Sequence, residues 1–438
     1  MIGLVQGAAA RMPLAAASVH QIVCSPPYYG KIEFTDGGDL GLEPLHDCNG
    51  WATGRNCGAC YVCRLRTFAA EAWRVLRDDG TFWVNLGDSY ISDHPGGRPG
   101  ADADGYVRRN RSGRRRASSP TLKPKDLAGI PARVALAFQA DGWWWRQRLP
   151  WVKANAMTDS AGDRPGQSLE EVLIFAKRHS YYFDMIAARE TLGISRNWRN
   201  GDGLLLLDVP TMPFDGQRLV ADFYRDGQAY IANPDCPLHG PMAQGRKFAT
   251  LGTGRGVPRT PARAARPGQL PLDIIFTEGC FCSPANLDHF ATWPTGLVET
   301  MIRAGTSDGG CCRACGTPFQ RRTRSEFIPQ QDIRDPGKLN RSRPDTLAGW
   351  SGSRRGRLQI ETLGFEPGCA CGAAAPAVPC LVLDPFAGTG TTGQVARDLR
   401  RDFVGLDLSH VYLRYQAFPR LGLDKSWKTV KQSNDVDS

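Results

Sequence analysis

The chain has 438 residues, with 54 lysines and arginines against 44 aspartates and glutamates, and a formal net charge of +10. Its length accommodates a catalytic domain of about 250 residues together with insertions. The basic balance favours a polyanionic partner, although solvated arginines alone would produce it. We recognise no signal peptide and no apolar segment long enough to cross a bilayer, so we expect a soluble, cytoplasmic protein without a membrane partner.

The first motif follows an apolar strand expected over residues 21–24 and reads Ser25-Pro26-Pro27-Tyr28. Its prolines lack a backbone N–H, so the turn is rigid and presents hydrogen-bond acceptors. The Ser25 hydroxyl and the Pro26 carbonyl could both accept from one amino group, while Tyr28 or Tyr29 offers a face on which a base can stack. Such a turn suits the exocyclic amine of a flipped nucleobase.

A Cys-rich insertion at residues 46–63 has the spacing of a metal site. Fourteen cysteines in a reducing compartment favour metal binding over disulfides, and structural zinc takes four nitrogen or sulfur ligands. Three sets have suitable spacing: Cys48, Cys57, Cys60 and Cys63; Cys236, His239, Cys280 and Cys282; and Cys312, Cys315, Cys369 and Cys371. The last set is similar to a zinc ribbon, and scattered free thiols are the alternative for all three.

A basic loop is expected at residues 95–123. It holds a dense run of arginines among Gly, Asn and Ser, and has no apolar face that could pack: Arg108, Arg109, Arg111, Arg114, Arg115 and Arg116. These side chains could grip DNA phosphates and add affinity with little sequence selectivity. A solvated loop without DNA contacts is the equal alternative.

Two further intervals lack a regular pattern. Residues 189–285 contain the polar stretch 196–200, whose side chains are candidates for major-groove contacts or for a solvent-facing turn. Residues 246–271, within the first interval, are rich in Arg, Pro and Gly and are interpreted as a disordered loop. Residues 326–357 are interpreted as another such loop, inside the ribbon insertion.

The second motif follows an apolar run at residues 380–383 and reads Asp384-Pro385-Phe386-Ala387-Gly388-Thr389-Gly390. A helix is expected from residue 391 to 399, so this is the strand, glycine turn and helix of a nucleotide-binding edge in a doubly wound α/β sheet. The next strand ends in Asp407, which could accept hydrogen bonds from ribose hydroxyls. No lysine lies between residues 384 and 407, which disfavours a triphosphate and leaves a nucleoside-containing ligand.

Together these motifs resemble those of the amino-methylating DNA methyltransferases, whose catalytic motif is [DNS]-P-P-[YF] and whose cofactor motif is D-P-F-x-G-x-G-T. The order of the motifs is similar to the β class, in which the catalytic half comes first. Segments 72–90, 126–153, 171–184 and 289–297 also resemble that family, in this order. The resemblance implies a Rossmann-like, S-adenosylmethionine-dependent methyltransferase fold, a circularly permuted three-layer α/β/α sandwich with small zinc-binding insertions.

The resemblance also implies roles for residues. The catalytic residues would be Ser25, Pro26, Pro27 and Tyr28. Those that bind S-adenosylmethionine would be Asp384, Pro385, Phe386, Gly388, Gly390, Thr391 and Asp407, with Phe290 and Pro294 near the methionine end. One departure is that Gly7 is followed by Ala8, whereas many relatives carry an acid there that contacts the adenine.

The implied organisation divides the chain by function. Residues 1–188 would form the catalytic half, 189–285 the target-recognition region, and 286–304 with 379–423 the cofactor-binding half. Residues 305–378 would be the zinc-ribbon insertion and 424–438 a tail.

The implied reaction is methylation of an exocyclic amine in double-stranded DNA. Serine in the catalytic motif is associated within the family with N4 of cytosine, while N6 of adenine stays open as the alternative. Methylation at carbon 5 is rejected because the only Pro-Cys pair, Pro379-Cys380, opens the cofactor strand. A catalytically inactive, zinc-containing DNA-binding module is the competing hypothesis. A bacterial or phage origin is expected, and a cognate restriction endonuclease and the oligomeric state, monomer or homodimer, stay open.

Overall fold

A nine-stranded mixed sheet organises the part of the chain that the computed structural model describes. The described residues are 1–30, 40–43, 55–91, 119, 121–153, 163–164, 167, 169–191, 275–277, 293–329, 356–371, 376–423 and 430–431. In sheet order the strands are β13 (Val430–Lys431), β1 (Ile2–Gln6), β12 (Asp402–Asp407), β11 (Leu381–Asp384), β2 (Val19–Cys24), β3 (Leu76–Leu86), β5 (Leu169–Ala176), β4 (Trp144–Lys153) and β6 (Ile275–Thr277). Neighbours are parallel except at β5, which runs antiparallel to β3 and to β4.

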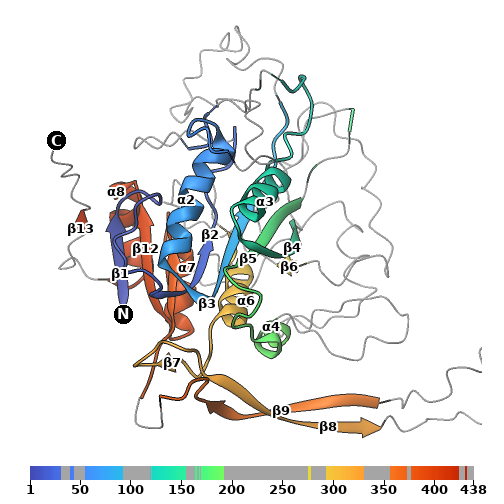
Figure 1. The fold of residues 1–438 in the computed structure, drawn as a ribbon, viewed down its shortest axis with the longest axis vertical. Coiled ribbons are helices and arrows are strands. Elements are labelled where there is room, and N and C mark those ends of the chain that lie inside the picture. Colours follow the sequence, from blue (N-terminus) through green and yellow to red (C-terminus); the bar gives the residue numbers. More distant parts are fainter. Residues whose placement is uncertain are drawn as a thin grey trace, which may run out of the picture.

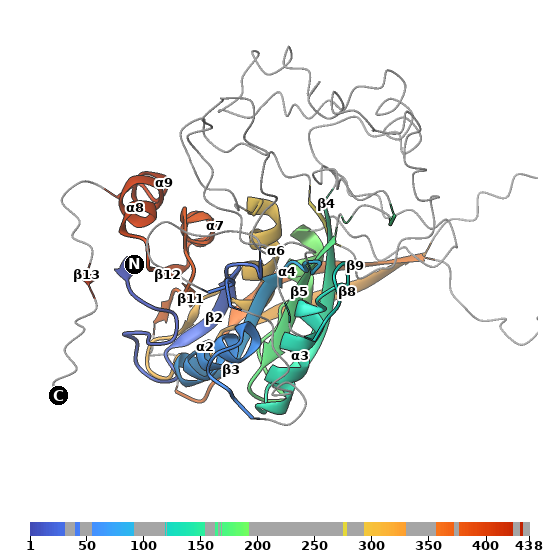
Figure 2. The same cartoon turned by 90° about the horizontal axis from the view of Figure 1, so that it is seen from above.

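Helices cover both faces of this sheet (Figures 1 and 2). Helices α2 (Tyr61–Val75) and α3 (Ile130–Ala140) pack on one face. The other face carries α4 (Met185–Thr191), α6 (Thr295–Gly305), α7 (Thr391–Asp398) and the consecutive short helices α8 (His410–Tyr412), η2 (Leu413–Ala417) and α9 (Phe418–Arg420). The predicted three-layer α/β/α sandwich is therefore confirmed.

Side-chain alternation along the strands explains why both faces are apolar. In β2, Ile22 and Cys24 join the core beneath α2 and α3, whereas Val23 joins the core on the side of α6. In β3, Phe82 and Trp83 divide in the same way. Because a central strand of such a sheet is buried on both faces, its sequence reads as a continuous apolar run rather than an alternating one.

The two ends of the chain meet in the centre of the sheet. Strand β11 pairs with β2 in parallel, with Leu383 opposite Ile22, and β12 pairs with β1 in parallel, with Asp407 opposite Gln6. The strands that precede Ser25 and follow Cys380 are thus direct neighbours, and their carboxyl ends share one edge. This placement is the permuted arrangement that the order of the motifs predicts.

A two-stranded β-arm extends from the end of the sheet that lies opposite the carboxyl ends of β2 and β11 (Figure 1). It consists of β8 (Gln320–Pro329) and β9 (Gly356–Glu366), paired antiparallel, next to the small ladder of β7 (Cys311–Cys312) and β10 (Ala377–Val378). The interpretation of residues 326–357 as a loop is wrong at its two ends, because 326–329 and 356–357 belong to these strands. Arginines interrupt the apolar alternation of β8, which hid the strand in the sequence.

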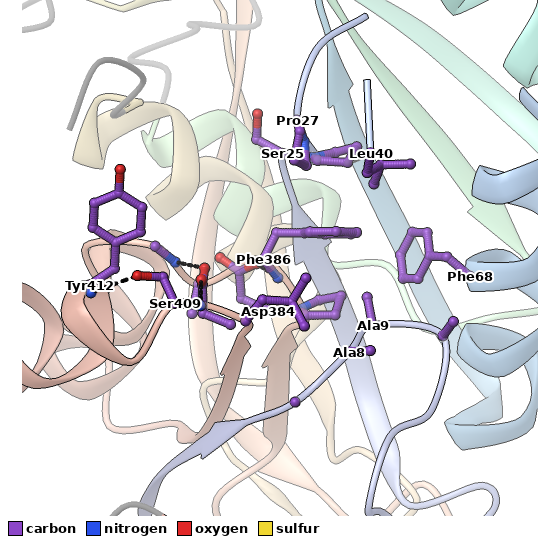
Figure 3. Close-up of a pocket in the computed structure, with 18 of the residues that line it drawn as sticks. Ala8, Ala9, Ser25, Pro27, Leu40, Phe68, Asp384, Phe386, Ser409 and Tyr412 are labelled. Atoms are coloured by element: carbon purple, nitrogen blue, oxygen red, sulfur yellow. Dashed lines mark hydrogen bonds between the residues drawn. The ribbon is translucent and has the colours of Figure 1, made fainter. Parts of the chain in front are cut away.

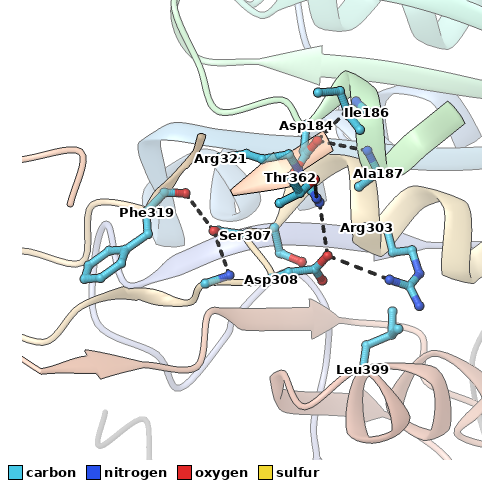
Figure 4. A network of polar contacts seen from close by, with 12 residues as sticks. Asp184, Ile186, Ala187, Arg303, Ser307, Asp308, Phe319, Arg321, Thr362 and Leu399 are labelled. Atoms are coloured by element: carbon cyan, nitrogen blue, oxygen red, sulfur yellow. Dashed lines mark hydrogen bonds and ion pairs between the residues drawn. The ribbon is translucent and has the colours of Figure 1, made fainter. Parts of the chain in front are cut away.

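A network of ion pairs joins the base of this arm to the body (Figure 4). The guanidinium of Arg321 in β8 contacts Asp184 at 2.8 Å and Asp308 at 3.2 Å. Asp308 also pairs with Arg401 at 2.6 Å and lies 3.8 Å from Arg303. Burial alone would raise the pKa of Asp308, but these arginines hold it below its ordinary value.

Across the described residues, none of the helices is both long and apolar enough to span a bilayer.

Candidate functional site

A cavity of about 340 Å³ lies at the carboxyl edge of the sheet, within the range of about 300–1,000 Å³ that is typical of small-molecule sites. Both sequence motifs line it (Figure 3). The predicted residues on its walls are Ser25, Pro26, Pro27, Tyr28, Asp384, Pro385, Phe386, Gly388, Thr391 and Asp407. Residues more than 350 positions apart in the chain therefore share one site, because β2 and β11 are neighbours in the sheet.

The hydroxyl of Tyr28 is the centre of a hydrogen-bond network in the catalytic turn. It donates to Glu170 Oε2 at 2.6 Å, and it accepts from Asn85 Nδ2 at 2.6 Å and from Ser25 Oγ at 3.4 Å. Burial and the Glu170 carboxylate raise the pKa of Tyr28 well above its ordinary value, so the phenol keeps its proton. Because the Ser25 hydrogen points to Tyr28, the lone pairs of Oγ remain acceptors for another group.

The two tyrosines that the sequence offered for base stacking differ in position. Tyr28 lines the cavity, and its ring lies so close to Gly87 that a Cβ there would stand 2.8 Å from it. Tyr29 is 1 % exposed and packs against Tyr61 of α2 with ring centroids 5.5 Å apart. Of the two, Tyr28 is therefore the one placed to meet a ligand in this cavity.

The glycine loop is held by the two acidic residues that frame it. Asp384 is buried, accepts from Thr392 Oγ1 at 2.5 Å and from the Phe386 N–H at 3.0 Å, and has a pKa raised to about 7, chiefly by burial. Asp407 accepts from the N–H groups of Gly388 and Ser409, each at 2.8 Å. Asp384 therefore shapes the loop, while Asp407 lines the cavity with a carboxylate that is suited to accept from a ligand.

The lining fits S-adenosylmethionine better than a nucleotide polyphosphate. Asp407 is suited to accept from ribose hydroxyls, and Phe386, between Ser25 and Ala8 in Figure 3, offers an aromatic surface for an adenine. Among the described residues of the lining, the only basic side chain is Arg64, on α2, which pairs with Glu43 at 2.7 Å. Arg420 donates to the hydroxyls of Thr389 and Thr391 in the glycine loop, but it is not among the residues that line the cavity. Ala8, Ala9 and Ala10 line the cavity, so this wall is apolar.

Two predicted cofactor residues are not among those that line the cavity, and a third falls outside the part of the chain that the structure describes. Pro294 is the N-cap of α6 and its neighbour Trp293 lines the cavity instead. Gly390 precedes α7 with φ of +79°, and a Cβ there would lie 3.0 Å from Ala417, so its role is to form the turn. Phe290 lies outside the described residues.

Sequence reasoning missed the wall that α2 contributes. Arg64, Thr67 and Phe68 line the cavity from this helix, and Ser409 and Tyr412 line it from beyond β12. The first three lie three and four positions apart, which places them on one helical face. The sequence shows that spacing, but it gave no sign that this face of the helix lines the same cavity as the two motifs.

The structure brings together all four cysteines of the predicted ribbon set and three of the four in the first set. The sulfurs of Cys312, Cys315, Cys369 and Cys371 all lie within 4.8 Å of one another, as do those of Cys57, Cys60 and Cys63. Zn–S bonds of about 2.3 Å in a tetrahedron require sulfurs at this kind of separation. Cys48, the set of Cys236, His239, Cys280 and Cys282, and the arginines at positions 108–116 lie outside the described residues.

His20, Cys311 and Cys380 form another group of possible metal ligands, but hydrogen bonds occupy both nitrogens of the histidine. His20 Nδ1 accepts from the Leu381 N–H at 2.9 Å, and Nε2 lies 2.8 Å from the Gly316 carbonyl, to which it donates. Burial lowers the pKa of His20, so a neutral imidazole joins β2, β11 and the ribbon. Both ring nitrogens are thereby occupied, and neither has a lone pair for a metal.

Comparison with known proteins agrees with this geometry. The family model for N6/N4 DNA methylases matches residues 19–312 and 380–418. The type II methyltransferase M.Cfr9I of Citrobacter freundii is 40 % identical over 206 residues, which are 46 % of this chain and 62 % of that protein. M.SmaI of Serratia marcescens is 36 % identical over 170 residues, 39 % of this chain and 53 % of that protein. The chain thus spans between half and two thirds of the length of these relatives.

One solved structure aligns with nearly the whole chain at low identity. The PvuII cytosine-N4-specific DNA methyltransferase aligns over 98 % of this chain and 88 % of its own, with 12 % identity and a TM-score of 0.44. The matched family model covers both motifs and most of the strands between them. The chain therefore belongs to the N6/N4 DNA methylase family.

Proposed function

We propose that this protein transfers a methyl group from S-adenosylmethionine to the exocyclic N4 of cytosine in double-stranded DNA. The observation that carries the proposal is that Ser25-Pro26-Pro27-Tyr28 and the loop at residues 384–391 line one cavity. The first motif offers acceptors for an amine, and the second offers a nucleoside site beside it. A methyl donor and an amino acceptor would therefore meet within a single pocket.

The residues of the turn orient the amine. The target base leaves the DNA stack and enters beside Tyr28. Its amino hydrogens are accepted by Ser25 Oγ and the Pro26 carbonyl, which directs the nitrogen lone pair out of conjugation with the ring. Bound S-adenosylmethionine supplies an electrophilic methyl on a sulfonium. The N–C bond would form as the S–C bond breaks, and the amine would then release one proton, so the products would be the methylated base, S-adenosylhomocysteine and H⁺.

The choice of cytosine over adenine rests on Ser25. An aspartate in its place would accept more strongly from the amine, whereas serine is the form associated with cytosine N4 in related enzymes. N6 of adenine is the alternative with the same fold and residues. Digestion of DNA methylated by the purified protein, followed by mass spectrometry of the nucleosides, is expected to find N4-methylcytosine. N6-methyladenine would move the assignment to adenine, and no methylated base with cofactor and DNA both bound would favour a DNA-binding module.

The division of the chain into regions is part of the same proposal. Residues 1–188 act as the catalytic half, 189–285 as target recognition, 286–304 and 379–423 as the cofactor half, 305–378 as the ribbon and 424–438 as a tail. The arginines at 108–116 would contact phosphates, in which case their replacement weakens binding to all DNA sequences alike and flattens its salt dependence. The restriction–modification relatives make a cognate endonuclease a partner worth testing in neighbouring genes.

Structural zinc in the ribbon completes the proposal. The sulfurs of Cys312, Cys315, Cys369 and Cys371 lie within 4.8 Å of one another. The β7–β10 ladder beside them pairs only Ala377 with Cys312 and Val378 with Cys311, and metal binding supplies folding free energy to such small units. The ribbon lies at the edge of the sheet opposite the cavity, so its zinc would be structural. Metal analysis of untagged protein is expected to find at least one zinc per chain, and less than one would contradict this site.

A further inference from the structure

A second cysteine cluster lies at the start of α2, beside the candidate active site. The sulfurs of Cys57, Cys60 and Cys63 are mutually within 4.8 Å. Two of them accept backbone hydrogen bonds, Cys63 Sγ from the Cys57 N–H and Cys57 Sγ from the Cys60 N–H, each at 3.3 Å. Amide groups that point at sulfur stabilise the thiolate, which is the form that ligates metals.

The surroundings of the cluster suit an anionic centre. Cys60 is the N-cap of α2, yet it makes no side-chain capping bond, and the first turn of the helix contains no acidic residue. A metal–thiolate centre would supply the negative charge that this helix end favours. Arg66 is 4 % exposed, hydrogen bonds Cys63, and forms an ion pair with Asp141. A buried guanidinium beside the sulfurs offsets the cost of burying their charge.

The same turn of α2 contacts the catalytic turn directly. The Tyr61 hydroxyl, one residue after Cys60, donates to the Pro27 carbonyl at 2.7 Å, and its side chain is fully buried. Gly58, between the first two cysteines, lines the cavity. A second chain of contacts also links α2 to the segment that follows the catalytic turn. Arg64 pairs with Glu43, whose Oε2 accepts from the Gly41 N–H. The Gly41 carbonyl in turn accepts from the Gly30 N–H.

We propose that Cys57, Cys60 and Cys63 bind a zinc ion that positions the Ser25-Pro26-Pro27-Tyr28 turn through Tyr61. The ion fixes the first turn of α2, and the Tyr61 hydroxyl transmits that position to Pro27, next to the carbonyl that receives the amine. This proposal rests on the proposed methyl transfer. Cys48, the fourth ligand predicted from the sequence, lies outside the described residues.

The ribbon provides a matched control. Its cysteines lie at the opposite edge of the sheet and contact β2 and β3 through Gly316 and Cys315, whose carbonyls accept from His20 and Arg77. Loss of zinc there should leave the catalytic turn in place. Cys57 and Cys315 are both exposed, so serine is tolerated by packing at either site.

The test uses the full chain and three readouts: zinc per chain by mass spectrometry, the single-turnover methylation rate, and hydrogen exchange of the peptide spanning residues 21–30. Cys57→Ser is expected to lose one zinc, to slow methylation roughly tenfold with little change in cofactor affinity, and to exchange faster at the amides of residues 28–30. Tyr61→Phe should slow methylation while retaining all zinc. Because both act through one contact, the double variant should be no slower than the slower single variant. Cys315→Ser should lose one zinc and keep the rate.

Each outcome decides a separate point. Unchanged zinc in Cys57→Ser overturns the metal site, and lost zinc with unchanged exchange at 21–30 overturns the coupling to the turn. Equal slowing in Cys315→Ser would also overturn it, because the effect would then be general. Should wild-type protein methylate no DNA, the proposed function fails, while zinc content and exchange still decide this inference.

Discussion

Ser25 depends on its neighbours for its acceptor role, because its hydrogen is directed to Tyr28. Ser25→Ala should therefore reduce the single-turnover methylation rate by roughly 10², the size of effect seen when one transition-state hydrogen bond is removed, while cofactor affinity stays near wild type. Tyr28→Phe is the matched variant, since it keeps the ring but frees the serine hydrogen, and it should cost less. An unchanged rate in Ser25→Ala would refute the assigned role.

Asp384 should make stability depend on pH in an unusual direction for a carboxylate. Its pKa is raised to about 7 by burial, against about 3.9 in an unfolded chain. Between these values the folded state binds the extra proton, so its contribution to stability is complete below about pH 4 and is lost as pH rises through about 7. Thermal unfolding at pH 5 and 8 should show a larger loss in wild type than in Asp384→Asn. Equal losses would contradict the raised pKa.

Gly390 shows what the cofactor loop demands of its backbone. It has φ of +79° directly before α7, and an added Cβ would stand 3.0 Å from the Cβ of Ala417. Gly390→Ala should lower the free energy of unfolding by about 1–3 kcal/mol and weaken cofactor binding. Gly296 is the control, because it lies exposed in α6 and a Cβ added there would meet nothing within 4 Å. Gly296→Ala should be neutral or stabilising by up to about 1 kcal/mol, as measured by denaturant unfolding.

Elements were predictable from the sequence where local pattern and burial agree. The apolar runs before Ser25 and Asp384 became β2 and β11, because central strands are buried on both faces and need no alternation. The wall made by α2 was not predictable, since helical spacing identifies a buried face but not its neighbour. The arm was missed for a related reason: exposed arginines such as Arg322 and Arg324 occupy β8, which pairs with β9 in a separate two-stranded sheet.

For the whole molecule, the order of the motifs carried more information than any single motif. The catalytic motif near the start and the cofactor motif near the end can share one site only if the strands before them are neighbours in one sheet. Strands β2 and β11 are such neighbours. The contacts that join the arm to that sheet could not be predicted, because no sequence motif links their residues. Asp184 precedes α4, Asp308 lies between α6 and β7, and Arg321 is in β8. Their association depends on the tertiary structure alone.

That junction yields a test of how the arm is held. The Arg321 side chain is 9 % exposed and bridges Asp184, itself 4 % exposed, to Asp308. Asp308 keeps Arg401 and Arg303 beside it, but the buried carboxylate of Asp184 loses its guanidinium, so Arg321→Ala should cost about 3–5 kcal/mol of stability and expose the arm to proteolysis near β8. Arg324 is the control on the same strand, since its side chain is 69 % exposed and pairs with Glu361 at the surface. Arg324→Ala should change stability by less than about 1 kcal/mol, and equal losses in the two variants would show that the arm is not anchored through Arg321.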